Sequence, residues 1–474
     1  MYDIAIIGAG VVGALIAREL SRYDLKIALL EKDSDVASGT TKGNSAIVHA
    51  GFDAETGTLK AELNVKGCEM MPETARELGV HYKNNGSLVC AFSDGETERL
   101  KILKKRGDAN GVTGLEIISG EKLFGFEPNL SREATAAIYA PTAGIICPYF
   151  LTVAAVENAV LNGCDLFFDF EVERIEKQDN IYVITGGRKK IAAGFIINSA
   201  GLYSDEIAKM CGEDIAGYKI IPRKGEYMLM DKGAGEIVGA TLFSVPSEKG
   251  KGILVAPTVD GTLVIGPNAV ETEKDDVSTT AAGLAEIQEG AKRLVPGLNM
   301  RKVITSFAGV RSTPKNHDFN IFISRDILHL IGIESPGLAA SPAIAGYAVN
   351  LLKNNGIRLI EKNDYIYKIN RKKMFRDMSG EERAEAIREN KLYAKIICRC
   401  ETVTEAEIID FIKSACPALN LDALKRRTRA GMGRCQGGFC SPRIVEILAR
   451  ECGADMLEIT KKGAGSHILT GRTK

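Results

Sequence analysis

The sequence MYDIAIIGAGVVGALIARELSRYDLKIALLE, residues 1–31, places a glycine-rich turn between a run of β-branched residues and a stretch with helical apolar spacing. Gly8, Gly10 and Gly13 form the pattern G-x-G-x-x-G, and a second apolar run ends at Glu31. Glycines at these positions allow a tight turn and a close approach of the backbone to a pyrophosphate, and a terminal carboxylate can bind a ribose hydroxyl. The stretch therefore predicts a βαβ unit that binds a dinucleotide.

The composition is that of a globular protein large enough for two or three domains. Of its 474 residues, 45% are hydrophobic, and 61 Lys and Arg balance 61 Asp and Glu, so no net charge attracts nucleic acid. No apolar run approaches the roughly 20 residues that span a bilayer. Asp3 stands where a signal peptide carries positive charge. We expect a cytoplasmic protein with no transmembrane segment and no nucleic-acid partner.

Later strand-like runs alternate with helical segments, which predicts an α/β fold with an added antiparallel element. Residues 356–393 are charged and poor in core residues, and Ser379 followed by Glu382 indicates a capping box at the start of a short surface helix. We assign 356–393 to a linker. Residues 394–474 are then a small, mainly helical domain, and domains of this size usually need a metal or another staple to fold.

Of the six cysteines in this last segment, four have the spacing C-x-C and C-x4-C, namely Cys398, Cys400, Cys435 and Cys440. Four thiolates suit a [2Fe-2S] cluster or tetrahedral zinc. Zinc sites more often use C-x2-4-C in both halves, so the tight C-x-C pair favours the cluster. The basic residues beside the second pair either add positive charge near the cluster or form a solvated face; they are Lys425, Arg426, Arg427, Arg429 and Arg434.

Several separated stretches resemble the FAD-dependent D-amino-acid oxidase superfamily, in the branch that contains L-2-hydroxyglutarate and glycerol-3-phosphate dehydrogenases. They are ASGTTKGNSAIVHAGF (37–52), EVERI (171–175), INSAGLYSD (197–205) and SPGLAASPAIAG (335–346). The resemblance covers residues 1–355 and implies a Rossmann-like FAD-binding domain with an inserted antiparallel-sheet substrate domain. It assigns about 1–80, 145–215 and 300–355 to the FAD-binding part, and about 81–144 and 216–299 to the substrate part.

The same resemblance implies which residues contact FAD. The small-residue loop would lie along the pyrophosphate and the flavin ring, EVERI would present its backbone to the adenine, and SPGLAASPAIAG would hold the pyrimidine end of the flavin. With the glycine motif, the expected cofactor-binding residues are Gly8, Gly10, Gly13, Glu31, Thr40, Thr41, Asn44, Ser45, Val172, Gly201, Gly337 and Leu338.

His49 and Arg311 are the catalytic candidates. Oxidation of a CH–OH group by hydride transfer needs a base for the hydroxyl proton, and an anionic substrate usually needs a cation to fix it. His49 lies in an apolar context, where a structural histidine is the alternative, and Arg311 offers a bidentate fork, where a surface or ion-paired arginine is the alternative. The resemblance favours the functional reading of both. Lys224 and Tyr227, in IPRKGEYMLM, are candidates for the wall of the substrate pocket.

The stretches CRCETVTEAEI (398–408) and RTRAGMGRCQGGFC (427–440) resemble the bacterioferritin-associated-ferredoxin-like [2Fe-2S] domain of the anaerobic glycerol-3-phosphate dehydrogenase large subunit. The resemblance implies a dehydrogenase that passes electrons through this cluster to a partner subunit or quinone, with any membrane contact made through the partner. We favour oxidation of sn-glycerol 3-phosphate to dihydroxyacetone phosphate. L-2-hydroxyglutarate, an amine substrate, and a non-catalytic electron-transfer flavoprotein subunit are the alternatives.

Overall fold

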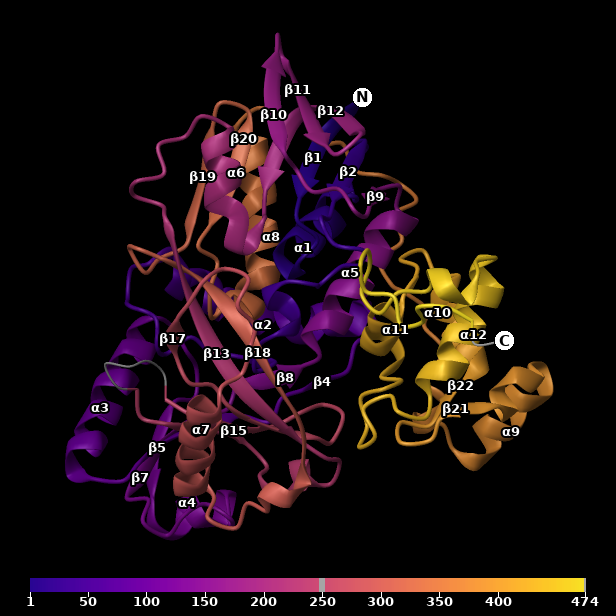
Figure 1. Cartoon of the computed structure of the whole chain (residues 1–474). Coiled ribbons are helices and arrows are strands. Elements are labelled where there is room, and N and C mark those ends of the chain that lie inside the picture. The colour runs from indigo at the N-terminus through magenta and orange to yellow at the C-terminus, as the bar shows by residue number, and fades with distance from the viewer. Residues whose placement is uncertain (247–251, 473–474) are drawn as a thin grey trace.

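The computed structural model of the chain describes residues 1–246 and 252–472. Two large sheets lie one above the other in Figure 1, and the C-terminal residues form a separate helical domain at their right-hand side. Among the described residues, none of the helices has the length and apolar character needed to cross a membrane.

The first sheet has eight strands and contains the glycine-rich turn. Its central strand β1 (Tyr2–Ile7) pairs in parallel with β2 (Ile27–Leu30) on one side and β12 (Lys189–Asn198) on the other. Beyond these lie β9 (Asp165–Phe167), β10 (Arg174–Gln178), β11 (Ile181–Gly186), β19 (Asn320–Ser324) and β20 (Ile327–Ile331). This arrangement is the predicted βαβ unit, because parallel neighbours require a crossover helix such as α1 (Val11–Leu20).

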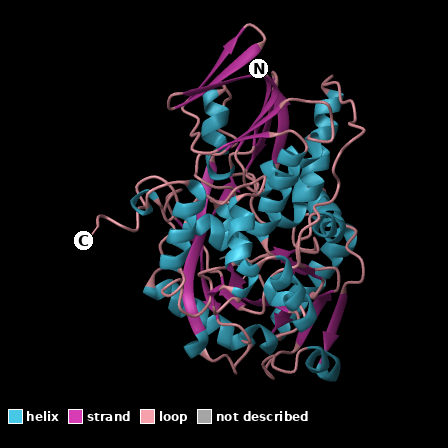
Figure 2. Cartoon of the chain, turned by 90° about the vertical axis from the view of Figure 1, so that its right-hand side faces the viewer, coloured by secondary structure: helices cyan, strands magenta, loops and turns pink. Residues whose placement is uncertain are grey.

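Buried helices cover the first sheet. Most of them share one apolar core with its strands. In Figure 2, helices occupy the centre of the view and strands lie above, beside and below them. Besides α1, the helices are α2 (Leu59–Glu77), α5 (Pro148–Leu161), α6 (Ser204–Met210) and α8 (Gly337–Asn354).

The second sheet has nine strands and is the expected antiparallel element. Its two longest strands, β13 (Ile220–Met230) and β18 (Val303–Pro314), pair along their whole lengths. The other strands are β5 (Ser87–Ala91), β6 (Glu116–Ser119), β7 (Ala136–Ala140), β14 (Thr241–Ser244), β15 (Leu254–Pro257), β16 (Leu263–Gly266) and β17 (Val270–Glu271). The sequence assigned 300–355 to the cofactor-binding part, whereas β18 belongs to this second sheet. Its alternating apolar residues fit either sheet, and only the pairing with β13 distinguishes them.

Shorter elements complete this region. Helices α3 (Asp94–Ala109), α4 (Gly120–Phe126) and α7 (Ala281–Leu294) pack on the second sheet. Three short strands, β3 (Ile47–Val48), β4 (Tyr82–Lys83) and β8 (Gly144–Ile146), form a separate small sheet. In the chain they occur where it passes from one large sheet to the other. The small sheet carries the segment that leads to His49.

The residues assigned to a linker are packed along the first sheet's helices. Tyr365 is buried, and its hydroxyl donates to Asn158 Oδ1 (3.0 Å), while the Ile366 N–H donates to Asn162 Oδ1 (2.8 Å). Helix α9 (Gly380–Glu389) begins with the capping box of Ser379 and Glu382 that the sequence predicts. The segment is therefore a strap held against the first sheet's helices by buried polar contacts. Its charged composition gave no indication of these contacts.

The C-terminal domain consists of the hairpin β21 (Ile396–Cys398) and β22 (Val403–Thr404) and three helices, α10 (Glu405–Ile412), α11 (Leu421–Thr428) and α12 (Ser441–Cys452). Its apolar core includes Cys398 and Cys440. Helix α11 packs against α5 of the first sheet. The domain is thus docked on the same helix that covers the nucleotide-binding sheet, as Figure 1 shows.

Buried ion pairs hold this domain in place. They involve three of the basic residues that the sequence placed either near the cluster or on a solvated face. Asp35, in the loop after β2, accepts hydrogen bonds from Arg426 (Nε, 3.0 Å) and Arg427 (Nη2, 2.8 Å), and all three side chains are at least nine-tenths buried. Arg429 is also buried and pairs with Asp260 (2.7 Å). These three arginines therefore do not form a solvated face, whereas the Arg434 side chain is 82% exposed and pairs with Asp231. The sequence could not pair them with carboxylates about 170 to 390 residues away.

Candidate active site

A cavity of about 1340 Å³ is lined by residues of both large sheets. The glycine turn, the loop after Glu31 and the start of α8 line one part, while β13 and β18 line another. All the expected cofactor-binding residues line it except Gly13, which packs behind the turn. The sequence thus selected a spatially connected set from five separate segments.

The glycine turn leaves a cradle that side chains would fill. Gly8 has φ +101°, and a β-carbon there would lie 2.6 Å from the Ser199 carbonyl oxygen. A β-carbon at Gly13 would overlap the Gly8 carbonyl oxygen. Gly10 precedes the first residue of α1, and the N–H groups of the first turn beyond that of Val11 stand at the helix start, where a pyrophosphate can bind.

Glu31 presents a buried carboxylate to the cavity. Its oxygens accept hydrogen bonds from the Ala9 N–H (2.9 Å) and the Asp33 N–H (3.0 Å). Burial nevertheless raises the pKa of Glu31 to about 7, because these two backbone donors and nearby Lys32 only partly offset the loss of solvent. Hydroxyl donors from a ribose would complete the hydrogen bonding of this carboxylate.

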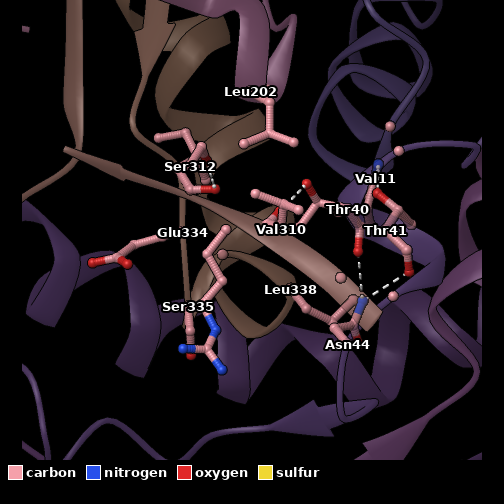
Figure 3. Close-up of a pocket in the computed structure, with 18 of the residues that line it drawn as sticks. Val11, Thr40, Thr41, Asn44, Leu202, Val310, Ser312, Glu334, Ser335 and Leu338 are labelled. Atoms are coloured by element: carbon pink, nitrogen blue, oxygen red, sulfur yellow. Dashed lines mark hydrogen bonds between the residues drawn. The ribbon is translucent and has the colours of Figure 1, made fainter. Parts of the chain in front are cut away.

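The loop that follows is braced by its own polar side chains. Thr41 Oγ1 accepts from the Val11 N–H (3.1 Å), and Thr40 Oγ1 donates to the Val310 carbonyl (2.8 Å). Asn44 Nδ2 donates to the Thr41 carbonyl (2.7 Å). Figure 3 shows these three side chains gathered beside Val310 and Leu338. The loop is thereby fixed between the start of α1 and β18, so its backbone can face a ligand in a set conformation.

Two arginines lie side by side on neighbouring strands of the second sheet, where the sheet borders the cavity. Arg311 on β18 is the register partner of Arg223 on β13, and both line the cavity. Arg311 Nη2 donates to the Asn268 carbonyl (3.4 Å), and Arg223 Nε is buried without a hydrogen-bond partner. Arg223 was not selected from the sequence, although its place in IPRKGEYMLM, beside two selected residues, was a usable signal.

His49 and Tyr227 also line the cavity, whereas Lys224 does not. The His49 ring lies 5.8 Å from the Phe243 ring, and Tyr227 stacks on Phe307 with 4.8 Å between ring centroids. Lys224, on the opposite face of β13 from Arg223, donates to Asp276 (2.6 Å). Strand alternation explains the difference, because neighbouring residues on β13 point to opposite faces.

A buried ion pair that the sequence did not indicate closes another side of the cavity. Lys60 Nζ donates to Glu334 Oε1 (2.8 Å), and Glu334 Oε2 accepts from the Thr313 hydroxyl (2.8 Å). Figure 3 shows Glu334 beside Ser335 at this wall. Lys60 and Glu334 are 274 residues apart, so no spacing in the sequence relates them.

The four clustered cysteines form two pairs, each joining the β21–β22 hairpin to the segment before α12. Cys400 Sγ lies 3.9 Å from Cys435 Sγ, and the Cys398 and Cys440 side chains hydrogen-bond to each other, which lowers the pKa of the Cys398 thiol to about 6. A β-carbon at Gly433 would overlap the Cys400 side chain, so this glycine is needed for the approach. In the part of the chain that the structure describes, no three His, Cys, Asp or Glu residues are grouped for a single metal ion. Two thiolate pairs match the ligation of a two-iron cluster.

Two family models match the chain in the two regions just described. The model described as FAD dependent oxidoreductase matches residues 3–351, and the model described as BFD-like [2Fe-2S] binding domain matches residues 396–450. The glycine turn, the cavity and β18 fall within the first match, and all four clustered cysteines fall within the second.

Characterised relatives resemble the chain over much of its length. A glycerol 3-phosphate dehydrogenase of Caloramator mitchellensis is 48% identical over 100% of this chain and 99% of its own length. A glycerol 3-phosphate oxidase of Mycoplasma pneumoniae is 31% identical over 74% of this chain and 94% of its own. The human mitochondrial L-2-hydroxyglutarate dehydrogenase is 27% identical over 73% of this chain and 87% of its own.

Solved structures agree with the arrangement of the two sheets. The dithionite-reduced L-α-glycerophosphate oxidase from M. pneumoniae with FAD bound has a TM-score of 0.74 and 31% identity, and the match covers 79% of this chain and 99% of that chain. The glycerol-3-phosphate dehydrogenase from Bacillus halodurans, complexed with FAD, has a TM-score of 0.66 at 17% identity and covers 96% of this chain and 91% of that one, which supports the fold.

Proposed function

The chain belongs to the FAD-dependent oxidoreductases, and from this premise we propose that it oxidises sn-glycerol 3-phosphate to dihydroxyacetone phosphate. The single observation that carries the choice of substrate is the pair Arg223 and Arg311, opposite each other at the cavity. The 48% identity over the whole chain to a glycerol 3-phosphate dehydrogenase supports it.

The cavity fits FAD. The glycine cradle and the free N–H groups of α1 would hold the pyrophosphate, and Glu31 would accept from ribose hydroxyls. The backbones of Val172 and Gly201 would line the adenine half, and Gly337 and Leu338 the flavin half. When bound, FAD accepts the hydride of the CH–OH carbon.

Arg223 and Arg311 would bind the phosphate of the substrate. Side chains directly opposite on paired strands have their β-carbons about 5 Å apart, and like charges at that distance are destabilising unless an anion lies between them. Guanidinium groups match phosphate oxygens with two parallel hydrogen bonds each. An anion held here fixes the orientation of a three-carbon substrate with respect to the rest of the cavity.

His49 would accept the hydroxyl proton. An imidazole has a pKa near neutrality in water, which suits a general base, and the ring lines the same cavity as the arginine pair. Tyr227 stacked on Phe307 would form an apolar wall that excludes water from the reacting carbon. The proton leaves on His49 while the carbon becomes a ketone.

Electrons would leave the chain near Cys400, by way of a cluster that carries them one at a time when bound. Cys400 is exposed, and Phe439, between Cys435 and Cys440, is 87% exposed. An aromatic side chain this exposed beside the expected cluster ligands suits contact with a partner. We propose a protein partner or a quinone as the electron acceptor, reached at this surface.

An anaerobic substrate panel read at the flavin absorption band tests the function. We expect glycerol 3-phosphate to bleach the flavin, and L-2-hydroxyglutarate and amino acids to leave it oxidised. Bleaching by L-2-hydroxyglutarate alone would mean that L-2-hydroxyglutarate, and not glycerol 3-phosphate, is the substrate. Reduction by none of the panel would leave an electron-transfer subunit without its own substrate.

Arg311→Lys tests the phosphate contact. Lysine keeps the charge but loses the bidentate geometry, and a hydrogen bond to a charged group is worth about 1.5–3 kcal/mol. We expect half-reduction of the flavin to need at least about tenfold more glycerol 3-phosphate. Arg188→Lys, at an exposed hairpin position of the first sheet, is the matched control. Normal reduction of Arg311→Lys at low substrate would exclude Arg311 as the anchor.

A further inference from the structure

A second cavity, of about 360 Å³, lies where the C-terminal domain meets the rest of the chain. Its lining comes from five regions: the end of α2, the start of α5, the loop between β15 and β16, the strap between the domains, and helix α11 with the residue that follows it. The glycerol 3-phosphate proposal does not involve this cavity, and its lining residues differ from those of the large cavity.

The lining of this second cavity is strongly cationic. Asp260 is the one carboxylate among its described lining residues, and His81 also lines it. The lysines and arginines that line it are Arg76, Arg371, Lys372, Lys373, Arg376, Arg426, Arg427 and Arg429. Three of these, Arg76, Lys372 and Lys373, are exposed at the outer end, whereas the arginines of α11 are buried.

The ion pairs of the inner arginines leave positive charge in excess. Asp35 pairs with both Arg426 and Arg427. Arg376 and Arg429 each pair with Asp260 and Glu401, Lys232 also pairs with Glu401, and Arg376 also pairs with Asp377. Arg371 pairs with Glu157 at 2.5 Å. Six cations therefore face five carboxylates, an excess of one positive charge. The cations are Lys232, Arg371, Arg376, Arg426, Arg427 and Arg429, and the carboxylates are Asp35, Glu157, Asp260, Asp377 and Glu401.

Three of these arginines also have buried nitrogens without a hydrogen-bond partner, which are Arg371 Nε, Arg376 Nη1 and Arg429 Nη2. Arg376 Nη1 lies 3.5 Å from Glu401 but makes no hydrogen bond. Buried polar atoms in folded proteins are nearly always hydrogen-bonded, and unmatched buried charge is costly. Unmet donors on three arginines around one cavity indicate a missing acceptor.

We propose that this interdomain cavity is a binding site for a small phosphate-type anion, either inorganic phosphate or pyrophosphate, or a small phosphomonoester. Guanidinium groups bind phosphate oxygens in a bidentate manner, and the cavity volume suits a ligand of this size. Because the lining comes from both sides of the domain boundary, a bound anion links the C-terminal domain to the nucleotide-binding part. Binding to the docked state alone stabilises docking by mass action.

Titration calorimetry on the full-length, anaerobically purified holoprotein tests the site, with ionic strength held constant by chloride. The probes are inorganic phosphate, pyrophosphate and glycerol 3-phosphate in separate arms, which distinguish the possible sources of the phosphate group. We expect at least one probe to bind saturably at a site that Arg311→Gln does not remove, and to raise the melting temperature of the C-terminal domain.

Two variants and one control locate the binding. Lys372→Gln removes an exposed cation at the outer end and is expected to weaken binding roughly two- to fivefold. Arg376→Gln is expected to weaken it more than about tenfold, since its Nη1 is buried without a hydrogen-bond partner. Lys105→Gln, an exposed position on α3, is expected to change nothing. Lys372→Gln keeps the test valid if Arg376→Gln fails to fold.

The proposal is overturned if no probe binds beyond the site lost in Arg311→Gln, or if Lys372→Gln and Lys105→Gln bind equally. In either case the arginines of this cavity serve the contact between the domains and bind no anion. The outcome is independent of the substrate panel, because flavin bleaching and anion binding are read on different signals.

Discussion

Asp35→Asn should release the C-terminal domain from the rest of the protein. The Asp35 side chain is 1% exposed and both of its oxygens are used. Oδ2 accepts from Arg426 Nε (3.0 Å), Arg426 Nη2 (2.5 Å) and Arg427 Nη1 (3.0 Å), and Oδ1 accepts from Arg427 Nη2 (2.8 Å). Asparagine keeps the shape but loses the charge and replaces one acceptor by an N–H donor. Two buried guanidinium groups then face a neutral amide.

The expected cost follows from the burial of all three groups. Removing one partner of a buried ion pair costs about 3–5 kcal/mol, because the remaining charge has no compensation. At about 1.4 kcal/mol per factor of ten, the ratio of docked to undocked protein falls by roughly two to four powers of ten. Arg427 also donates to the Cys416 carbonyl (3.2 Å), which limits how far it can turn away.

Urea unfolding with two absorption signals measures the effect. The cluster band reports the C-terminal domain and the flavin band reports the remainder. We expect the cluster transition of Asp35→Asn to move to lower urea while the flavin transition changes much less. Asp108→Asn is the matched control, since Asp108 forms an exposed i,i+4 pair with Lys104 on α3 and such pairs are worth about 0.3–0.5 kcal/mol.

The pH dependence gives a second measure of the same contact. Burial by itself raises the pKa of Asp35, but the charges of Arg427 and Arg426 outweigh it and hold the pKa below its usual value of 3.8. A carboxylate with a lowered pKa in the folded state stabilises that state above its unfolded pKa, and the contribution is lost as the pH falls through the folded pKa. Docking of the wild type should weaken below about pH 4, and docking of Asp35→Asn should not. If the variant unfolds as Asp108→Asn does and keeps the wild-type acid response, the reasoning is refuted.

Gly13→Ala should abolish FAD binding, because the new β-carbon overlaps the Gly8 carbonyl oxygen; flavin content after purification checks this, with Gly346→Ala on α8, where the β-carbon meets open space, as the control. The FAD-free protein should lose stability as the pH rises from about 4.5 to about 7, since Glu31 has a raised pKa in the folded state, and Glu31→Gln should remove this loss in a series of thermal melts. Cys400→Ser should lose the cluster absorption but keep flavin bleaching by substrate, whereas Cys452→Ser should keep both; equal loss of bleaching would mean that the two centres are not separable.

The local motifs were predictable because their chemistry is contained in short stretches. The glycine turn, Glu31 at the end of a strand, the capping box at Ser379 and the cysteine spacing each depend on residues a few positions apart. The resemblance to a known family then extended these to a cavity-lining set that the structure brings together. Only Gly13 and Lys224 of that set do not line the cavity, the first because it packs behind the turn and the second because of strand alternation.

The long-range pairs were not predictable in the same way. Arg223 opposite Arg311, Lys60 with Glu334, and Asp35 with Arg427 each join residues 88 to 392 positions apart. A basic residue in a sequence gives no sign of which carboxylate will neutralise it. For this reason the sequence left open whether the run from Arg426 to Arg429 adds positive charge near the cluster or forms a solvated face, although it is among the most buried parts of the C-terminal domain.

The burial of the run from Arg426 to Arg429 has a functional reason. An enzyme that holds a flavin in one domain and a cluster in another needs a rigid contact between the two domains. Electron transfer slows steeply with distance, so the cysteine loop must keep a fixed position relative to the flavin site. The strap of some forty residues could not fix that position by itself. The loop between Glu31 and Thr41 lines the cofactor cavity along much of its length and contacts Arg426 and Arg427 at Asp35. One loop therefore carries both the cofactor contacts and the domain contact, and a buried charge pair holds it more rigidly than exposed pairs would.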